Sequence, residues 1–250
     1  MGMATWAITT ASIVAITQTD ESAAAPSAWG CIALSLILGT VLVAFALPRV
    51  VVDSALTVAH PAIRAVEAGY RPGVSETLAD AVGLAAASDR SAEAWSLAGR
   101  LDVAMAVYGG GLEGPARSAA FAAAGGKFAH ALARSPMDTR DWLRYTHALL
   151  ASDQFIEAAR AWRLSVLTGA FDPNLMFARE RVGLSLWRYM DLPTRDAFGQ
   201  QLLVHWRWGP GGLAELLAKH GGGDIGVAAL APWPDAAADL RRRLDRMAGR

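Results

Sequence analysis

The feature that most constrains this chain is the pattern of large and small side chains in residues 136–169, which predicts two short helices folded against each other. In each half, apolar or small residues recur at spacings of three, four and seven, which places them on one face of a helix. In the first half they are Trp142, Tyr145, Thr146 and Leu149. In the second half they are Phe155, Ala158, Ala159, Trp162, Ser165 and Val166. Two such stripes facing each other are expected to form a helical hairpin.

Short polar residues mark the expected ends of these two helices. Asp138 or Thr139 can accept hydrogen bonds from the free N–H groups of the first helical turn. Ser152 and Asp153 interrupt the stripe, so we expect them to cap the second helix. Gly169 is then the expected helix stop.

The hairpin resembles the tetratricopeptide repeat, a helix–turn–helix unit with an aromatic residue early in its first helix and an alanine and an aromatic residue in its second. The residues that carry the resemblance are Trp142, Phe155, Ala158 and Trp162, with Pro136 where a preceding unit would end. The sequence departs from the family pattern at Thr146, where a smaller residue is usual, and at the closing proline, which is displaced to Pro173.

Weaker copies of the hairpin are expected on both sides of it. Upstream, residues 121–136 repeat the second-helix pattern, and residues 92–107 fit the first helix. A glycine-rich inserted loop, residues 109–115, is expected between these two helices. Downstream, residues 173–191 and 193–208 are expected to form a further helix pair. The chain would therefore contain several helical hairpins in series.

An uncharged apolar run, residues 28–47, has the length needed to cross the hydrocarbon core of a bilayer. Trp29 lies near one end of the run, and Pro48 and Arg49 follow the other. The alternative is a buried helix of a soluble protein, but such a helix normally carries a polar stripe. We therefore expect residues 28–48 to form a transmembrane helix that contacts the lipid bilayer.

These expectations divide the chain into five segments and give an all-α fold class. The segments are an N-terminal tail (1–27), a transmembrane helix (28–48), a juxtamembrane helix and linker (49–73), tetratricopeptide-like hairpins forming an α-solenoid (74–208) and C-terminal capping helices (209–250). Within the fourth segment, residues 75–87 are expected to form a short alanine-rich helix. In the last segment, a helix from Pro234 has acidic residues early and arginines late, which agrees with the helix dipole. It is expected to close the stack, with contact to anionic lipid as the alternative.

Composition and motifs weigh against several classes of function. The formal net charge is +0, so the chain has no overall electrostatic attraction to nucleic acid. Cys31 is the only cysteine, which excludes an intramolecular disulfide. The histidines, His60, His130, His147, His205 and His220, lack the spacing of metal ligands, and no nucleophile motif occurs. We therefore expect no cofactor, no metal site, no catalytic residue and a function other than catalysis.

A stack of helical hairpins offers a concave surface lined by the first helix of each unit. The register of the pattern places Arg140, Leu143, His147, Phe177, Arg179 and Arg181 on this surface. We expect it to bind a protein partner in the membrane or the cell envelope. The alternative is a glycan-binding subunit that uses tryptophan side chains, drawn from Trp95, Trp142, Trp162, Trp187, Trp206, Trp208 and Trp233.

Three stretches, WLRYTHALL, FIEAARAWRLSVLTG and PNLMFARERVGLSLW, resemble small membrane-anchored helical-repeat proteins that accompany bacterial exopolysaccharide and O-antigen assembly. The resemblance implies a single-pass protein of the bacterial inner membrane, with a periplasmic helical domain that organises polymerase or export components. Arg49, directly after the span, favours a cytoplasmic domain instead. The sequence thus leaves the side of the membrane open.

Overall fold

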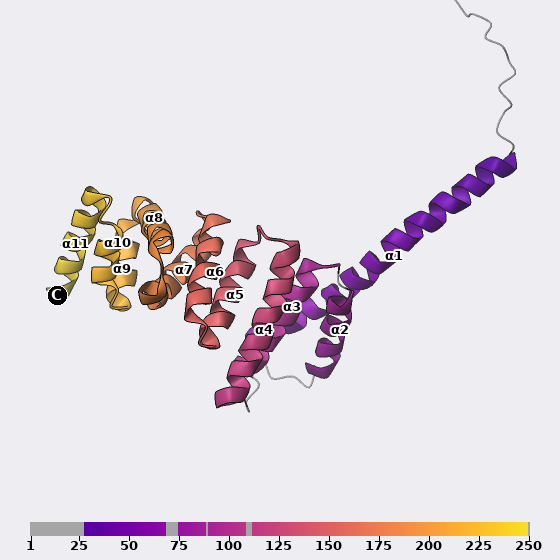
Figure 1. The fold of residues 1–250 in the computed structure, drawn as a ribbon, viewed down its shortest axis with the longest axis horizontal. Helices are drawn as coiled ribbons and strands as arrows, with labels where there is room; N and C mark the ends of the chain where they lie inside the picture. Colours follow the sequence, from indigo (N-terminus) through magenta and orange to yellow (C-terminus); the bar gives the residue numbers. More distant parts are fainter. Residues whose placement is uncertain (1–27, 69–74, 89, 109–111, 250) are drawn as a thin grey trace, which may run out of the picture. The chain divides into compact units, whose positions relative to one another are not determined.

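A computed structural model of the chain describes residues 28–68, 75–88, 90–108 and 112–249. Within these ranges the secondary structure is helical, without a strand (Figure 1). The predicted all-α class is thereby confirmed. The predicted tail, residues 1–27, and the glycines at 109–111 lie outside the described ranges. The chain divides between Leu47 and Pro48 into two compact units, and each is considered separately below.

The first unit contains the start of helix α1, Ala28–Glu67, and with it the predicted apolar run. Its side chains from Gly30 to Leu47 are all exposed. The Thr40 hydroxyl donates a hydrogen bond to the Leu36 carbonyl at 2.8 Å, which satisfies a polar group in this apolar stretch. The most apolar 18-residue window of α1 has a mean hydropathy of 2.5, and the helix is long and apolar enough to cross a membrane.

In the second unit, the rest of α1 packs with α2, Ser75–Ala87, and α3, Ala92–Tyr108. The buried α1 side chains recur at helical spacing and form one face. They are Val52, Leu56, Ala59 and Ile63. The predicted juxtamembrane helix therefore also contributes to a hydrophobic core.

The central hairpin consists of α5, Thr139–Ala151, and α6, Phe155–Leu167, and it follows α4, Gly114–Arg134. The Asp138 carboxylate accepts hydrogen bonds from the backbone N–H groups of Arg140 at 2.9 Å and Asp141 at 3.0 Å, so the predicted first cap is confirmed. Helix α4 begins at Gly114, inside the predicted loop at residues 109–115, and it runs for almost six turns.

The predicted cap of the second helix is wrong. Ser152 instead ends α5, because its hydroxyl donates to the Ala148 carbonyl at 2.9 Å. Asp153 adopts a left-handed conformation with φ of 62°, and Gln154 precedes α6 without a side-chain cap. The turn between the two helices is thus built from the C-terminal end of α5. Helix α6 ends at Leu167, just before the predicted stop at Gly169.

The remaining helices follow α6 in chain order (Figure 1). They are α7 (Pro173–Leu186), the 3-10 helix η1 (Trp187–Tyr189), α8 (Leu192–Trp208), α9 (Pro210–Lys219), α10 (Gly223–Ala229) and α11 (Pro234–Ala248). Helix α9 begins at Pro210, because proline is favourable at the first helical position. The largest hydrophobic core extends from α5 to α11.

Trp162 lies at the centre of this core with no exposed surface. Its ring packs against Phe198 at 5.6 Å between centroids, and its Nε1–H donates to the Arg179 carbonyl at 2.8 Å. Gly183 makes this packing possible: a Cβ atom there would lie 2.5 Å from Phe198 Cε2 and 3.1 Å from Trp162 Cζ2. The three helices α6, α7 and α8 therefore meet around a glycine.

Replacing Gly183 by alanine should disrupt this contact. We expect Gly183→Ala to lower the free energy of unfolding by about 1–3 kcal/mol, because the rings must shift out of their packed positions. The measurement is urea unfolding of the detergent-solubilised chain followed by circular dichroism. Gly126→Ala is the matched control: it lies in α4 with nothing within 4 Å of the added Cβ, so we expect it to be stabilising by about 0.5–1 kcal/mol. Equal urea concentrations at the midpoint of unfolding for the two variants would contradict the close packing of Phe198 and Trp162 on Gly183.

Candidate functional site

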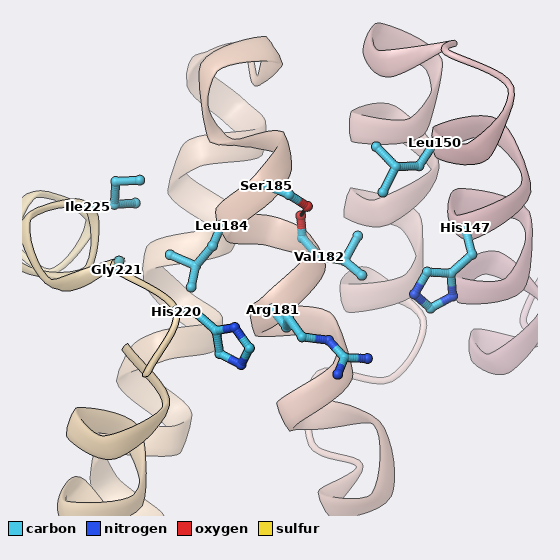
Figure 2. A pocket seen from close by; sticks show the side chains of 10 residues that line it. His147, Leu150, Arg181, Val182, Leu184, Ser185, His220, Gly221 and Ile225 are labelled. Carbon is cyan, nitrogen blue, oxygen red and sulfur yellow. Dashed lines mark hydrogen bonds between the residues drawn. The ribbon is translucent and has the colours of Figure 1, made fainter. Parts of the chain in front are cut away.

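A pocket of 430 Å³ lies in the second unit, between α5, α7 and the turn that joins α9 to α10. We call it the basic pocket, and it is lined by His147, Leu150, Arg181, Val182, Leu184, Ser185, His220, Gly221, Gly222 and Ile225. Figure 2 shows His147, Arg181 and His220 directed toward one space from three different elements. None of the ten lining residues carries a carboxylate. The pocket therefore combines basic side chains with an apolar wall.

Arg181 reaches the basic pocket because its two predecessors are held in the interior. Residues 179–181 are consecutive charged residues of α7, and a helix turns by about 100° per residue, so their side chains leave it in three directions. Arg179 and Glu180 have no exposed surface, whereas Arg181 is exposed. The first two thus determine how α7 is rotated and where the third points.

Arg179 is bound by the C-terminal end of α6. Its guanidinium donates to the carbonyls of Ser165 at 2.7 Å and Gly169 at 2.6 Å, to the Ser165 hydroxyl at 3.0 Å and to the Thr139 hydroxyl. Burial lowers the pKa of Arg179, and the Asp172 carboxylate acts in the opposite direction. The charge is favourable where it lies, because the last carbonyls of a helix lack intrahelical partners and carry partial negative charge. Arg179 therefore joins α5, α6 and α7.

Glu180 joins α7 to α8. Its carboxylate oxygen Oε2 lies 2.7 Å from His205 Nδ1, and both side chains are buried. Burial raises the pKa of Glu180, although the hydrogen bond and charge of His205 lower it. Phe177 covers His205 edge-on, with 4.8 Å between ring centroids. The pair is thus enclosed beneath an aromatic side chain.

The turn after α9 brings His220 to α7. Gly221 adopts a left-handed conformation with φ of 64°, and the Gly222 N–H donates to the Leu217 carbonyl at 2.8 Å, which is a Schellman end to the helix. A Cβ at Gly222 would lie 2.6 Å from Leu184 Cδ2. A glycine at this position therefore lets the turn contact α7 closely and places His220 beside Arg181.

His147 faces the same space from α5 and is exposed at the surface. Its pKa is lowered, first because neighbouring protein atoms displace water from the ring and second because the Arg181 guanidinium disfavours another positive charge. Arg181 itself makes no hydrogen bond or ion pair with another residue in the described ranges. The pocket thus presents free donor groups to solvent.

The structure brings together only part of the predicted groove. His147 and Arg181 line the basic pocket, whereas Arg140 is exposed away from it and Phe177 packs on His205. Leu143 and Arg179 are buried, at 5% and 0% exposed, so the prediction that they line the groove is wrong. Leu143 belongs to the interior face of α5, and Arg179 is drawn inside by the α6 carbonyls.

His220 is the pocket residue that sequence reasoning missed. It follows α9 in the predicted C-terminal cap, and no local sequence pattern connects it with His147 or Arg181. The glycine run at residues 221–223 after it was the available signal, because it predicts a sharp chain reversal at this point.

The tryptophans proposed for glycan binding are mostly enclosed. Among those in the described ranges only Trp208 is exposed, at 53%, while Trp162 is fully buried. Trp208 contacts Phe171 and Phe177, with centroids 6.5 and 6.3 Å apart, and both are exposed. These three residues form an exposed aromatic cluster that could stack on a sugar ring.

Across the described part of the chain, no cluster of three or more histidine, cysteine, aspartate or glutamate side chains is placed to hold a metal ion. A scan of protein-family models and searches of curated proteins and of solved structures found no match to this chain. The functional proposal below therefore depends on the chain's own residues.

Removing the buried guanidinium should be costly. We expect Arg179→Met to lower the free energy of unfolding by about 2–5 kcal/mol, because the Gly169 carbonyl and the Ser165 hydroxyl lose the guanidinium that donates to them. Arg181→Met, two residues away but exposed, is the matched control and should change it by less than about 0.5 kcal/mol. Urea unfolding followed by circular dichroism measures both. Similar losses for the two variants would show that Arg179 does not hold the helices together.

Glu180 should make stability depend on pH. Because the folded state raises its pKa above the unfolded value of about 4.3, its stabilising contribution is present below that pH and is lost as pH rises through the folded pKa. Glutamine does not titrate. We therefore expect Glu180→Gln to become more stable relative to wild type between about pH 5 and about pH 7.5, as measured by urea unfolding.

Glu157→Gln is the control for this pH series, because Glu157 is exposed on α6. Its stability relative to wild type should stay nearly constant over the same interval. If Glu180→Gln instead lost stability relative to wild type as the pH rose, the folded state would favour the ionised carboxylate, contrary to the raised pKa.

Proposed function

We propose that this chain is a non-enzymatic, membrane-tethered helical-repeat scaffold that binds a protein partner through the basic pocket. The observation that carries the proposal is the convergence of His147, Arg181 and His220 from three elements onto one accessible pocket. A surface assembled in this way binds across several helices at once, which is how stacked repeats recognise other chains.

The repeat part of the proposal pairs α3 with α4, α5 with α6 and α7 with α8 as tetratricopeptide-like units. Its support is that consecutive helices in this region pack on one another and that the small and aromatic stripe of α6 is buried as the pattern requires. Trp162 and Ala158, which carry the resemblance, both have no exposed surface. Helices α9 to α11 would then close the end of the stack.

The tether in the proposal is α1, crossing the bacterial inner membrane once. Its support is the exposed apolar surface of the helix between Gly30 and Leu47. In this proposal the helical part lies in the periplasm and organises polymerase or export components, as the resemblance to exopolysaccharide and O-antigen accessory proteins would imply. The partner is accordingly a protein of the membrane or the envelope.

Site-directed crosslinking tests this function. Ser185 lines the basic pocket and is exposed, so Ser185→Cys in a Cys31→Ser chain provides a single attachment point for a benzophenone maleimide. After illumination of intact membranes, we expect one defined protein adduct. Labelling of the same cysteine by a membrane-impermeant maleimide in spheroplasts checks the periplasmic side.

Gln200→Cys in the same background is the matched control, because Gln200 is exposed on α8 and does not line the pocket. It should give no adduct with the partner. Adducts shared equally by both positions, or none at Ser185→Cys, would refute the scaffold function. Recovery of polysaccharide in place of protein would favour the glycan-binding alternative, which would use the aromatic cluster of Phe171, Phe177 and Trp208.

A further inference from the structure

We infer that the basic pocket recognises an acidic segment of the partner protein, in which a carboxylate is flanked by apolar side chains. This inference rests on the proposed function and adds to it the chemistry of the partner. The argument has three parts: the charge of the pocket, the donors that remain free in it and the apolar wall beside them.

The charge of the pocket is of one sign. Arg181 brings a guanidinium cation to the pocket, and no lining residue carries a carboxylate. By contrast, Arg243 pairs with Asp239 at 2.7 Å and Arg144 pairs with Asp141 at 2.7 Å. A carboxylate from outside would supply the missing counter-charge.

The donors are arranged around one space. A guanidinium can bind both oxygens of a carboxylate, and each imidazole has a ring N–H group that can add a further hydrogen bond. His147, Arg181 and His220 come from α5, α7 and the α9–α10 turn, so they approach the ligand from different sides (Figure 2). Because Glu180 and Arg179 hold α7 in place, Arg181 is presented without the cost of ordering its helix.

The apolar wall distinguishes a protein segment from a small anion. Leu150, Val182, Leu184 and Ile225 line the pocket beside the donors. A free phosphate or an acidic sugar would leave this wall in water, whereas leucine or valine side chains next to a glutamate or aspartate would bury it. The combination of cation and apolar wall therefore favours an acidic, apolar peptide.

Peptide binding to the full-length chain in zwitterionic nanodiscs tests the inference. The probe is a fluorescent peptide of alternating leucine and glutamate, with blocked ends, and its counterpart has glutamine in place of glutamate. We expect fluorescence anisotropy to show at least roughly tenfold tighter binding of the acidic peptide, since charge-assisted hydrogen bonds are lost with glutamine. Arg181→Gln should weaken the acidic peptide by a similar factor and leave the glutamine peptide unchanged.

Arg160→Gln is the matched control, because Arg160 is exposed on α6 outside the pocket and its loss removes the same charge. It should leave both affinities unchanged. Equal binding of the two peptides, or equal effects of Arg181→Gln and Arg160→Gln, would overturn the inference. So would binding of a hyaluronan oligosaccharide, a carboxylate polymer without apolar side chains, in preference to the peptide. A persisting protein adduct at Ser185→Cys alongside any of these results would leave the proposed function standing.

Discussion

The arrangement of the central helices depends on how the exposed carbonyl groups at the end of α6 are satisfied. The last carbonyls of any helix lack intrahelical donors, and in a protein interior water cannot replace them. Arg179 supplies the missing donors from α7 while also binding Thr139 at the start of α5. One side chain therefore links three helices, and its own charge is balanced by the negative end of the helix that it caps.

This interaction has consequences for its neighbours along α7. Once Arg179 is fixed against α6 and Glu180 against His205, the rotation of α7 is determined, and Arg181 is directed into the basic pocket. Leu184 lies about one helical turn after Arg181, and its side chain contacts Gly222 in the turn that follows His220. Interior hydrogen bonds and surface chemistry are thus coupled through the geometry of a single helix.

The sequence predicted the helices better than the site. Helix α2 begins and ends at the predicted residues, and the buried stripe of α6 follows the predicted spacing. The site was harder because hydrophobic periodicity treats every arginine as a surface residue. Arg179 is buried by carbonyls that lie ten and fourteen residues away in the chain, and no local pattern reports such a contact. His220 enters through a tertiary contact of its glycine turn, which periodicity likewise does not describe.

The packing of Val52, Leu56, Ala59 and Ile63 against α2 and α3 sets a limit on how the protein can be divided. These side chains belong to the same helix as the apolar run, yet they fill a core of the second unit. A fragment that begins at α2 would leave that core without one of its walls and expose apolar surface. A cut near Pro48 would retain the wall and remove only the lipid-compatible part.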